Sequence, residues 1–307
     1  MSMIKGYLEQ QEIDPGLVAD VQAFRDTYEV DAQVRDRVLV PDVLFYGKDI
    51  LEMSIAVLLQ GDNLLLSGAK ATGKNVLCET LAWIFGRPSY DISFHVNTDS
   101  ASLIGTDTFI ANEVQLRKGP VYQCAEFGGF GILDEVNMAK NDAVAVLHAA
   151  LDHRRRIDVP GYSKIHLHPA TRFIGTMNDG YAGTKELNEA LVSRFMVIDM
   201  PPLDEETVRF LLKEYFRDAK DAALEQFAGV FLDLQTKAYN GEISTKPLDL
   251  RGLISAIAAM RSGLSPIHAI HMGIVNKSFD VFEKEIIGDA VGTRVPSTWT
   301  RADIFEG

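Results

Sequence analysis

Short apolar runs, each close to Gly, Pro, Asn or Asp, recur at wide intervals through the first two thirds of the chain. They are LLLS at 64–67, YDISFHV at 90–96, FGILDE at 130–135, RFIGTM at 172–177 and RFMVIDM at 194–200. Such runs are typical of strands buried on both faces of a parallel sheet. Helical patterns lie between them, as at 75–85, where Gly86 and Pro88 mark the end of the helix. We therefore expect an α/β domain with a parallel sheet flanked by helices.

The pattern changes after Pro201 and Pro202. From there to about residue 290 the apolar positions follow helical spacing and no run has the character of a strand. We expect a helical N-terminal extension over 1–40, an α/β domain over 41–202, a small all-helical domain over 203–290 and a loosely packed tail over 291–307.

Composition and charge narrow the class of protein. The chain has 307 residues, 47% of them hydrophobic, and a formal net charge of −13. This acidity counts against binding of nucleic acid through its phosphates; the basic runs at 117–119 and 154–156 read as solvated faces. The chain has no apolar run long enough for a membrane span and no signal-peptide pattern, and its two cysteines form no disulfide framework. We expect a cytoplasmic protein without membrane association.

The octamer GAKATGKN at 68–75 carries most of the chemistry. It follows the pattern G-x-x-x-x-G-K-[S/T], whose backbone N–H groups surround nucleotide phosphates and whose Ser or Thr hydroxyl binds Mg²⁺. Here Asn75 stands where the hydroxyl belongs. An amide oxygen can also ligate Mg²⁺, so Asn75 is better read as a changed metal ligand than as a lost one. The residues expected to bind nucleotide in this segment are Gly68, Ala69, Lys70, Ala71, Thr72, Gly73, Lys74, Asn75 and Val76.

Three further segments supply polar residues at the ends of expected strands. Asp134 and Glu135 follow a buried strand, where Asp suits Mg²⁺ coordination and the next carboxylate can activate a water. Asn178, after GTM, could hold that water or simply form a turn. Arg194 could stabilise transition-state charge, although taken alone it reads as a surface ion-pair partner.

Together these segments resemble the AAA+ ATPases, and among them the MoxR-like branch, which is related to dynein- and McrB-type ATPases. The motifs are LLLSGAKATGKNVL, GGFGILDEVNMA, RFIGTMN, LNEALVSRF and LDLRGLISAI. The resemblance implies ATP and Mg²⁺ as cofactors, with Asn75 and Asp134 toward the metal. It makes Lys74, Glu135, Asn178 and Arg194 the catalytic residues and Arg251 a nucleotide contact from the helical domain.

The resemblance also implies an assembly. Family members form rings, usually hexamers, in which the arginine corresponding to Arg194 reaches the neighbouring subunit's site. The segments 106–120 and 154–169 look like hairpins that face the central pore, and Asn97 looks like a polar switch for the catalytic Glu. MoxR-like ATPases act, in a chaperone-like way, with a separate protein of the von Willebrand factor A type. The adenine pocket is expected near Tyr46, Gly47 and Ile50.

We thus expect an ATPase that remodels or assembles a partner protein complex. Two alternatives stay open at this point. One is a nucleotide-gated binding module with weak or no hydrolysis, because of Asn75. The other is a nucleic-acid-directed motor subunit of the McrB type, against which the net acidity counts.

Overall fold

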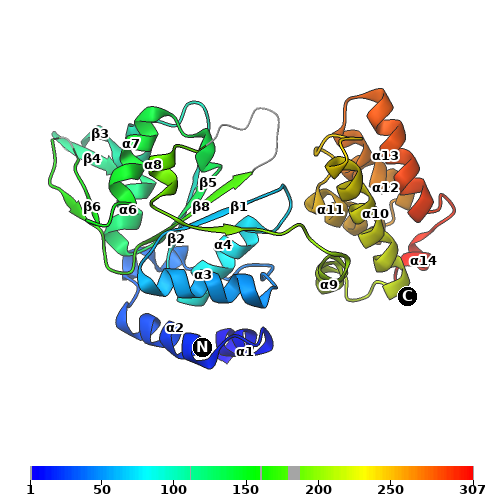
Figure 1. Ribbon diagram of the computed structural model, residues 1–307, viewed down its shortest axis with the longest axis horizontal. Coiled ribbons are helices and arrows are strands. Elements are labelled where there is room, and N and C mark those ends of the chain that lie inside the picture. The colour runs from blue at the N-terminus through cyan, green and yellow to red at the C-terminus, as the bar shows by residue number, and fades with distance from the viewer. Residues whose placement is uncertain (1, 111, 160, 179–186, 307) are drawn as a thin grey trace. The chain divides into compact units, whose positions relative to one another are not determined.

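A computed structural model describes residues 2–110, 112–159, 161–178 and 187–306 (Figure 1). The chain divides into two compact units. The first unit comprises residues 1–69 and 73–201, and the second comprises residues 202–307 together with 70–72.

The first unit is built on a five-stranded parallel sheet in the order β2-β5-β8-β1-β9. The strands are β1 (Leu64–Gly68), β2 (Ser89–Ser93), β5 (Phe130–Asp134), β8 (Arg172–Asn178) and β9 (Met196–Asp199). Each corresponds to one of the five apolar runs, so the expected α/β fold with a parallel sheet is confirmed. The central strands read as continuous apolar runs because both of their faces are covered.

The pairing register brings the polar strand ends to one edge of the sheet. Gly68 at the end of β1 pairs with Asn178 at the end of β8, and Asp134 at the end of β5 pairs with Ser93 of β2. Leu133 pairs with Gly175, which places Asp134 beside Thr176. Because the strands are parallel, all these residues lie at the carboxyl edge, where open α/β sheets bind ligands.

Helices cover the two faces of the sheet, and each face has its own buried apolar cluster. Helices α3 (Lys48–Gln60) and α4 (Lys74–Phe85) supply one cluster, and α5 (Ser100–Ile104), α6 (Pro120–Phe127) and α7 (Asn141–Ala150) supply the other. Two short helices, η2 (Val136–Met138) and α8 (Glu189–Val192), follow β5 and precede β9. The sheet is therefore fixed from both sides, which gives the loops at its carboxyl edge a rigid base.

The N-terminal segment belongs to this core. It forms the helices α1 (Ser2–Gln10), α2 (Pro15–Thr27) and η1 (Ala32–Arg37). Tyr7, Leu8 and Phe24 are buried in the same cluster as α3 and α4. Tyr7 also donates a hydrogen bond to the Phe45 carbonyl. The first 40 residues are thus part of the first unit's core.

Buried arginines hold the amino-terminal side of the sheet. Arg87 and Arg172 are only 1% and 4% exposed, and Arg25 and Arg155 are half-buried. Arg25, Arg87 and Arg172 donate to backbone carbonyls at the C-terminal ends of α3, α4 and α6, and Arg155 donates to the carbonyls of His168 and Thr171. Helix ends carry carbonyls without an intrahelical partner, so a guanidinium there satisfies them and opposes the negative end of the dipole.

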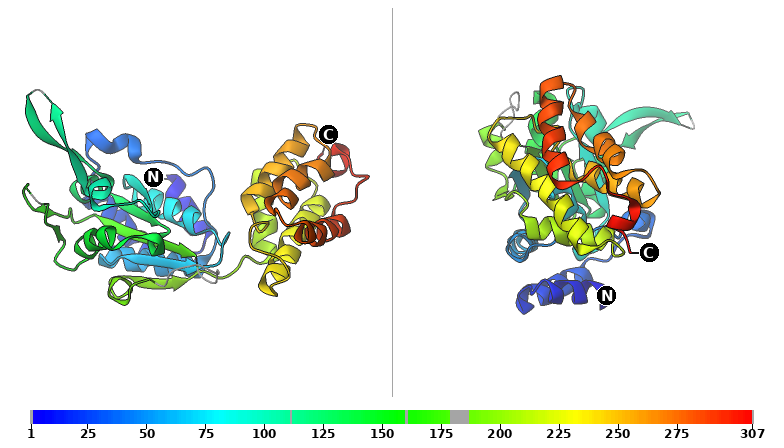
Figure 2. Two further views of the ribbon diagram at one scale, coloured as in Figure 1. Left: turned by 90° about the horizontal axis from the view of Figure 1, so that it is seen from above. Right: turned by 90° about the vertical axis from the view of Figure 1, so that its right-hand side faces the viewer.

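Two hairpins project from the first unit (Figure 2). They are β3 (Gly105–Ile110) with β4 (Glu113–Lys118), and β6 (Arg156–Ile157) with β7 (Ile165–His166). They correspond to the segments expected as hairpins at 106–120 and 154–169. The Tyr162 hydroxyl donates to Asp107 at 2.6 Å and so joins the two hairpins. Near the tip of the first one, Phe109 and Val114 face each other across the strands and are 71% and 62% exposed.

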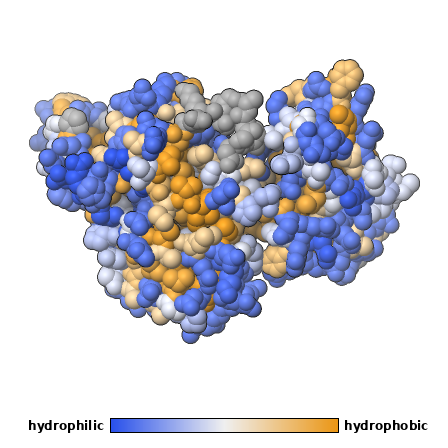
Figure 3. Space-filling view, in the orientation of Figure 1, coloured by the Kyte–Doolittle hydropathy of each residue, from blue (hydrophilic) through white to orange (hydrophobic). Residues whose placement is uncertain are grey.

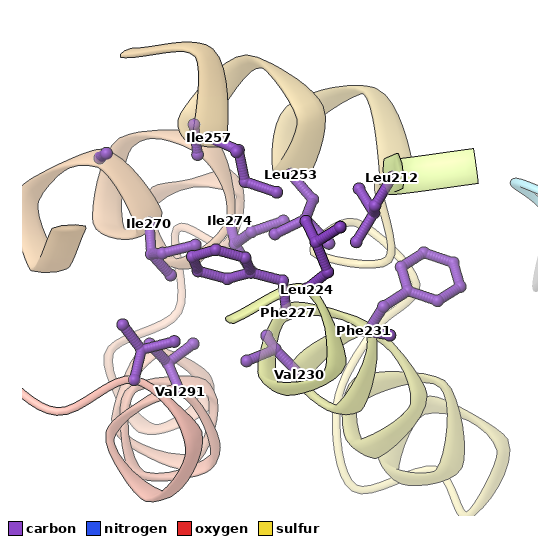
Figure 4. Close-up of a cluster of buried hydrophobic side chains, with 14 of the residues drawn as sticks. Leu212, Leu224, Phe227, Val230, Phe231, Leu253, Ile257, Ile270, Ile274 and Val291 are labelled. Carbon is purple, nitrogen blue, oxygen red and sulfur yellow. The ribbon is translucent and has the colours of Figure 1, made fainter. Parts of the chain in front are cut away.

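The second unit is all-helical, as expected after Pro202. It contains α9 (Glu205–Tyr215), α10 (Asp221–Tyr239), α11 (Leu250–Arg261), α12 (Pro266–Gly273), η3 (Val275–Lys277), α13 (Val281–Arg294) and α14 (Arg301–Ile304). Figure 4 shows apolar side chains of these helices meeting around Phe227 and Leu253, both fully buried. Across the described parts of the chain, no helix is at once long and apolar enough to traverse a bilayer.

The C-terminal tail differs from the loosely packed segment expected over 291–307. Helix α13 continues to Arg294, and Val295 and Ile304 are fully buried in the core of the second unit. Phe305 is 3% exposed, and the Lys220 N–H donates to the Ile304 carbonyl at 2.8 Å. Gly292 and Pro296 suggested loose packing, but the apolar residues around them are spaced to fill the helical core.

Candidate nucleotide-binding site

The phosphate-type loop connects β1 to α4 at the carboxyl edge of the sheet. Gly68 and Gly73 have φ values of 150° and 88°, a region that favours glycine. A Cβ on Gly68 would lie 2.7 Å from the Met200 carbonyl oxygen, so the loop needs glycine there for packing as well as for backbone conformation. Strand, loop and helix thus have the order that directs backbone N–H groups and the positive end of the α4 dipole toward phosphates.

Lys74 is held inside this loop. Its Nζ donates to the carbonyls of Gly68 at 2.8 Å and Ala69 at 2.7 Å, and the residue is 7% exposed. A buried ammonium requires such partners. Phosphate oxygens are stronger acceptors than carbonyls, so an incoming nucleotide can replace these bonds. The geometry fits the predicted role of Lys74.

Asn75 and Asp134 meet at the point where a metal ligand pair is expected. Asn75 Nδ2 lies 3.5 Å from Asp134 Oδ2, at the outer limit of a hydrogen bond. A half-turn of the amide would present its oxygen instead, which places two hard oxygen ligands side by side. The two residues present therefore fit Mg²⁺, with the Asn75 amide reoriented.

Thr176 is a site residue that sequence reasoning missed. Its hydroxyl donates to Asp134 Oδ1 at 2.5 Å and accepts a bond from the Glu135 N–H at 3.3 Å. The residue is 1% exposed. One buried hydroxyl thus fixes both acidic residues, and the register of β8 against β5 is what brings it there. In the sequence, its only signal is its place in an expected strand two residues before Asn178.

Glu135 and Asn178 complete this edge. Glu135 adopts the left-handed conformation with φ 54° and ψ 45°, and the residue is exposed. Non-glycine residues held in this conformation are often found at functional sites. Asn178 is paired in register with Gly68, so it lies next to the start of the loop. Asn97 is exposed and lies beyond the end of β2, on the same side of the sheet.

Arg194 lies elsewhere. It comes just before Met196 of β9, which pairs with Leu64 at the amino end of β1, whereas the loop begins at Gly68 at the carboxyl end. Four residue steps of a strand separate the two ends by about 13 Å. Asn63 holds this backbone, since its Nδ2 donates to the carbonyls of Leu151 at 3.3 Å and Arg194 at 3.4 Å. The structure therefore does not bring Arg194 to the phosphate-type loop of the same chain.

A cavity of about 600 Å³ opens beside Arg194. Charged and polar side chains line it, among them Asp62, Asn63, Asp152, His153, Arg155 and Arg194. It lies at the amino edge of β1 and β9, so it is distinct from the phosphate-loop site.

In the basic run at 154–156, two of the three guanidiniums are engaged by partners within the first unit. Arg154 Nε donates to Asp152 Oδ1 at 2.7 Å, and Arg155 donates to two backbone carbonyls. Arg156 remains exposed on β6. The run is therefore no continuous cationic surface, and this counts against the nucleic-acid alternative.

The other residues predicted to contact nucleotide lie in or beside the phosphate-type loop and in helix α11. Val76 is half-buried in the first turn of α4, and the Phe45 ring lies against Gly73, so the segment before α3 borders the loop near the expected adenine pocket. Ala71 has a φ of 65° and Thr72 is 3% exposed. Arg251 is exposed in the first turn of α11, in the second unit. Its contact with nucleotide stays a prediction.

Comparison with known proteins gives a consistent result. The model of a protein family described as "AAA domain (dynein-related subfamily)" matches residues 63–195. YojN of Bacillus subtilis, an uncharacterised protein, is 32% identical over 250 residues, which is 80% of this chain and 82% of YojN. An uncharacterised protein of Staphylococcus haemolyticus is 32% identical over 235 residues, covering 75% of this chain and 89% of its own.

Among solved structures, a RuvB point mutant from Thermotoga maritima is 16% identical, with a TM-score of 0.48 over 83% of this chain and 73% of that one. A second mutant gives 15% identity and a TM-score of 0.49 over 81% and 70%. The family assignment rests on the sequence matches and on the loop, strand order and acidic pair described above. The chain belongs to the AAA+ family, with an AAA domain of the dynein-related subfamily.

Proposed function

We propose that this protein is an ATP-hydrolysing AAA+ ring, of the MoxR-like branch, that remodels or assembles a partner protein complex. The observation that carries the proposal is the distribution of the polar groups. Lys74, Asp134, Glu135 and Asn178 all belong to the loop edge of the sheet, whereas Arg194 lies at the opposite edge. A subunit thus has all the groups for hydrolysis except the arginine, which a neighbour can supply.

Each residue of the loop edge has a role in this scheme. Mg²⁺ bound through Asp134 and Asn75 would neutralise phosphate charge. Lys74 exchanges its loop carbonyls for phosphate oxygens. Glu135 accepts the proton of the attacking water, and Asn178 orients that water from its position beside Gly68.

The surface of the first unit supports assembly. β9 is an edge strand, and Met196 and Val197 on it are 53% and 51% exposed. In the space-filling view, apolar residues gather over β9 and over α3, where Met53 is 46% exposed (Figure 3). Exposed apolar groups on a sheet edge favour a protein partner, and we infer that a second subunit covers them. A ring of six subunits is the arrangement proposed.

The proposed substrate is a protein. The joined hairpins present Phe109 and Val114, apolar groups suited to contact a polypeptide. A separate protein of the von Willebrand factor A type is the proposed partner. We propose a cytoplasmic location for this activity.

The experiment that tests the proposal compares two variants that fail at different steps. Glu135→Gln should bind ATP like the parent and release phosphate at least about 10²-fold more slowly, because general-base catalysis contributes about 10²–10⁴-fold. Arg194→Ala should also bind ATP and keep only a residual turnover, about 10³-fold or more below the parent, because an arginine of this kind contributes about 10³–10⁵-fold. Glu285→Gln, an exposed change of the same kind in the second unit, is the control. Parent turnover in Glu135→Gln would show that Glu135 is not the base.

Assembly is tested separately by mass measurement with and without ATP. The proposal expects a ring when ATP is bound, and turnover per subunit that rises with protein concentration until the ring is filled. Turnover that is independent of concentration, in a species that stays monomeric, would contradict the ring.

A second candidate is a nucleotide-gated binding module with weak hydrolysis. The contact between Asn75 Nδ2 and Asp134 favours it, because an amide that turns its nitrogen toward this carboxylate does not present its oxygen as a second ligand for Mg²⁺. Phosphate release with Mg²⁺ in the parent and in Asn75→Thr decides between the two. Turnover in the parent that Thr barely changes supports the ATPase. A parent without turnover that Asn75→Thr activates supports the binding module.

A further inference from the structure

We propose that Asp152 is the positioning residue for Arg194 and thereby controls phosphate release in the neighbouring subunit. Asp152 follows α7 and lies between two guanidiniums. Arg154 Nε donates to its Oδ1 at 2.7 Å, and Arg194 Nη2 lies 3.7 Å from its Oδ2. The Asp152 side chain is only 9% exposed. This inference rests on the proposed function of Arg194 as a group that acts between subunits.

The contacts of Arg194 show how the side chain is held. Nη1 donates to the Ala190 carbonyl in α8, and Nη2 faces Asp152 on the other side. Within the described ranges, Nε is buried and makes no hydrogen bond. With 28% of the side chain exposed, the guanidinium is fixed by α8 and Asp152 and borders the cavity of about 600 Å³. Removing the carboxylate would leave the Ala190 carbonyl to hold it.

The surrounding charges make Asp152 suitable for this role. The hydrogen bonds from Arg154 lower the pKa of Asp152 to about 2, so the carboxylate is ionised at neutral pH. Burial lowers the pKa of His148, and the nearby Arg194 lowers it further, so this imidazole is neutral at neutral pH. His153 Nδ1 lies 3.5 Å from Asp152 and is exposed, and Asp62 is exposed at the same cavity. Asp152 is thus the buried anion that orients Arg194.

The distance matters as much as the charge. At 3.7 Å, Arg194 Nη2 is beyond the 2.7–2.9 Å of a tight charge-assisted hydrogen bond. The carboxylate can therefore orient the guanidinium by attraction without using up its donors. A phosphate on the neighbouring subunit can then take those donors with little to displace. Pre-orientation of this kind affects the transition state and leaves nucleotide binding to the loop unchanged.

A double-mutant cycle tests the assignment. Asp152→Asn keeps the shape and removes the charge, and we expect about a tenfold lower turnover at saturating ATP, with affinity for a fluorescent ATP analogue within twofold of the parent. In an Arg194→Ala background the same change should have no further effect on turnover, because Asp152 acts through Arg194. The matched control is Asp221→Asn in the second unit, which removes a carboxylate that is paired with Lys213 and exposed. Its turnover should equal the parent's.

Three results would overturn the inference. They are parent turnover in Asp152→Asn, an equal loss in the Arg194→Ala background, and a loss of nucleotide affinity. The last two would indicate a structural role in the subunit's own fold.

Mixed assemblies separate this inference from the function on which it rests. Lys74→Ala subunits have an impaired site of their own but retain Arg194 and Asp152. Added in excess, they should restore turnover to Asp152→Asn subunits and to Arg194→Ala subunits. If only the Arg194→Ala subunits regain turnover, the role of Asp152 is overturned and the proposed ring is unaffected. Restoration of neither would overturn both, because the arginine would then not act between subunits.

Discussion

The substitution Thr176→Val tests the role of the hydroxyl that bonds to both acidic residues of the site, Asp134 and Glu135. Valine has nearly the same shape, so the substitution removes hydrogen bonds without opening a cavity. The hydroxyl donates to the Asp134 carboxylate and accepts from the Glu135 N–H, and the residue is 1% exposed. A hydrogen bond to a charged group contributes about 1.5–3 kcal/mol. We therefore expect the free energy of unfolding of the first unit to fall by about 2 kcal/mol.

That loss is measurable by calorimetry. For a unit of this size, 1 kcal/mol moves the melting temperature by about 2–4 °C, so the melting transition of the first unit should shift by about 4–8 °C. The control is Thr108→Val, whose hydroxyl bonds the Gln115 carbonyl on the exposed hairpin. A surface change of this kind should stay within about 0.5 kcal/mol. Equal melting temperatures for the two variants would show that the Thr176 bond does not stabilise the fold.

Three further predictions concern other parts of the first unit. Gly68→Ala should reduce nucleotide affinity at least about tenfold and lower the melting temperature, since its Cβ would meet the Met200 carbonyl oxygen at 2.7 Å. Titration with a fluorescent nucleotide measures the affinity, and an affinity equal to the parent's would contradict this prediction. Arg87→Met should destabilise the protein by roughly 3 kcal/mol in thermal melts, because one buried and two partly buried carbonyls lose their donor. A loss below about 1 kcal/mol would contradict that account. Arg154 lowers the pKa of Asp152 from 3.8 to about 2, so the ionised carboxylate stabilises the fold above about pH 4 and this stabilisation disappears as the pH falls through about 2. The difference in melting temperature between the parent and Asp152→Asn should shrink over that range, and a constant difference would exclude the linkage.

The fold could be predicted from the sequence because its strands are buried on both faces. Each of the five apolar runs became one strand, and the glycines and Lys74 in the octamer fixed where the loop lies. Asp134 and Asn178 could be placed at one edge because parallel strands end on the same side.

The remaining features depend on register and packing that no local pattern encodes. Thr176 acquires its role because β8 pairs with β5 in one particular register, and a polar residue in an apolar strand gives no hint of its partner. Asp152 and Arg194 are far apart in sequence and meet because α7 ends beside the start of β9. The tail after Arg294 looked loose because Gly292 and Pro296 interrupt it, while burial of Ile304 depends on the helices it meets.

The buried arginines change what the formal charge means for the protein surface. Of the 30 Lys and Arg residues that enter the net charge of −13, Arg87 and Arg172 are almost inaccessible and face backbone carbonyls. The net charge that the protein presents to solvent is therefore more negative than the net charge of the whole sequence. At physiological ionic strength an approaching molecule responds to charges within about 8 Å, so it meets this acidic exterior first. The fold thereby repels polyanions and favours partners that carry basic surfaces.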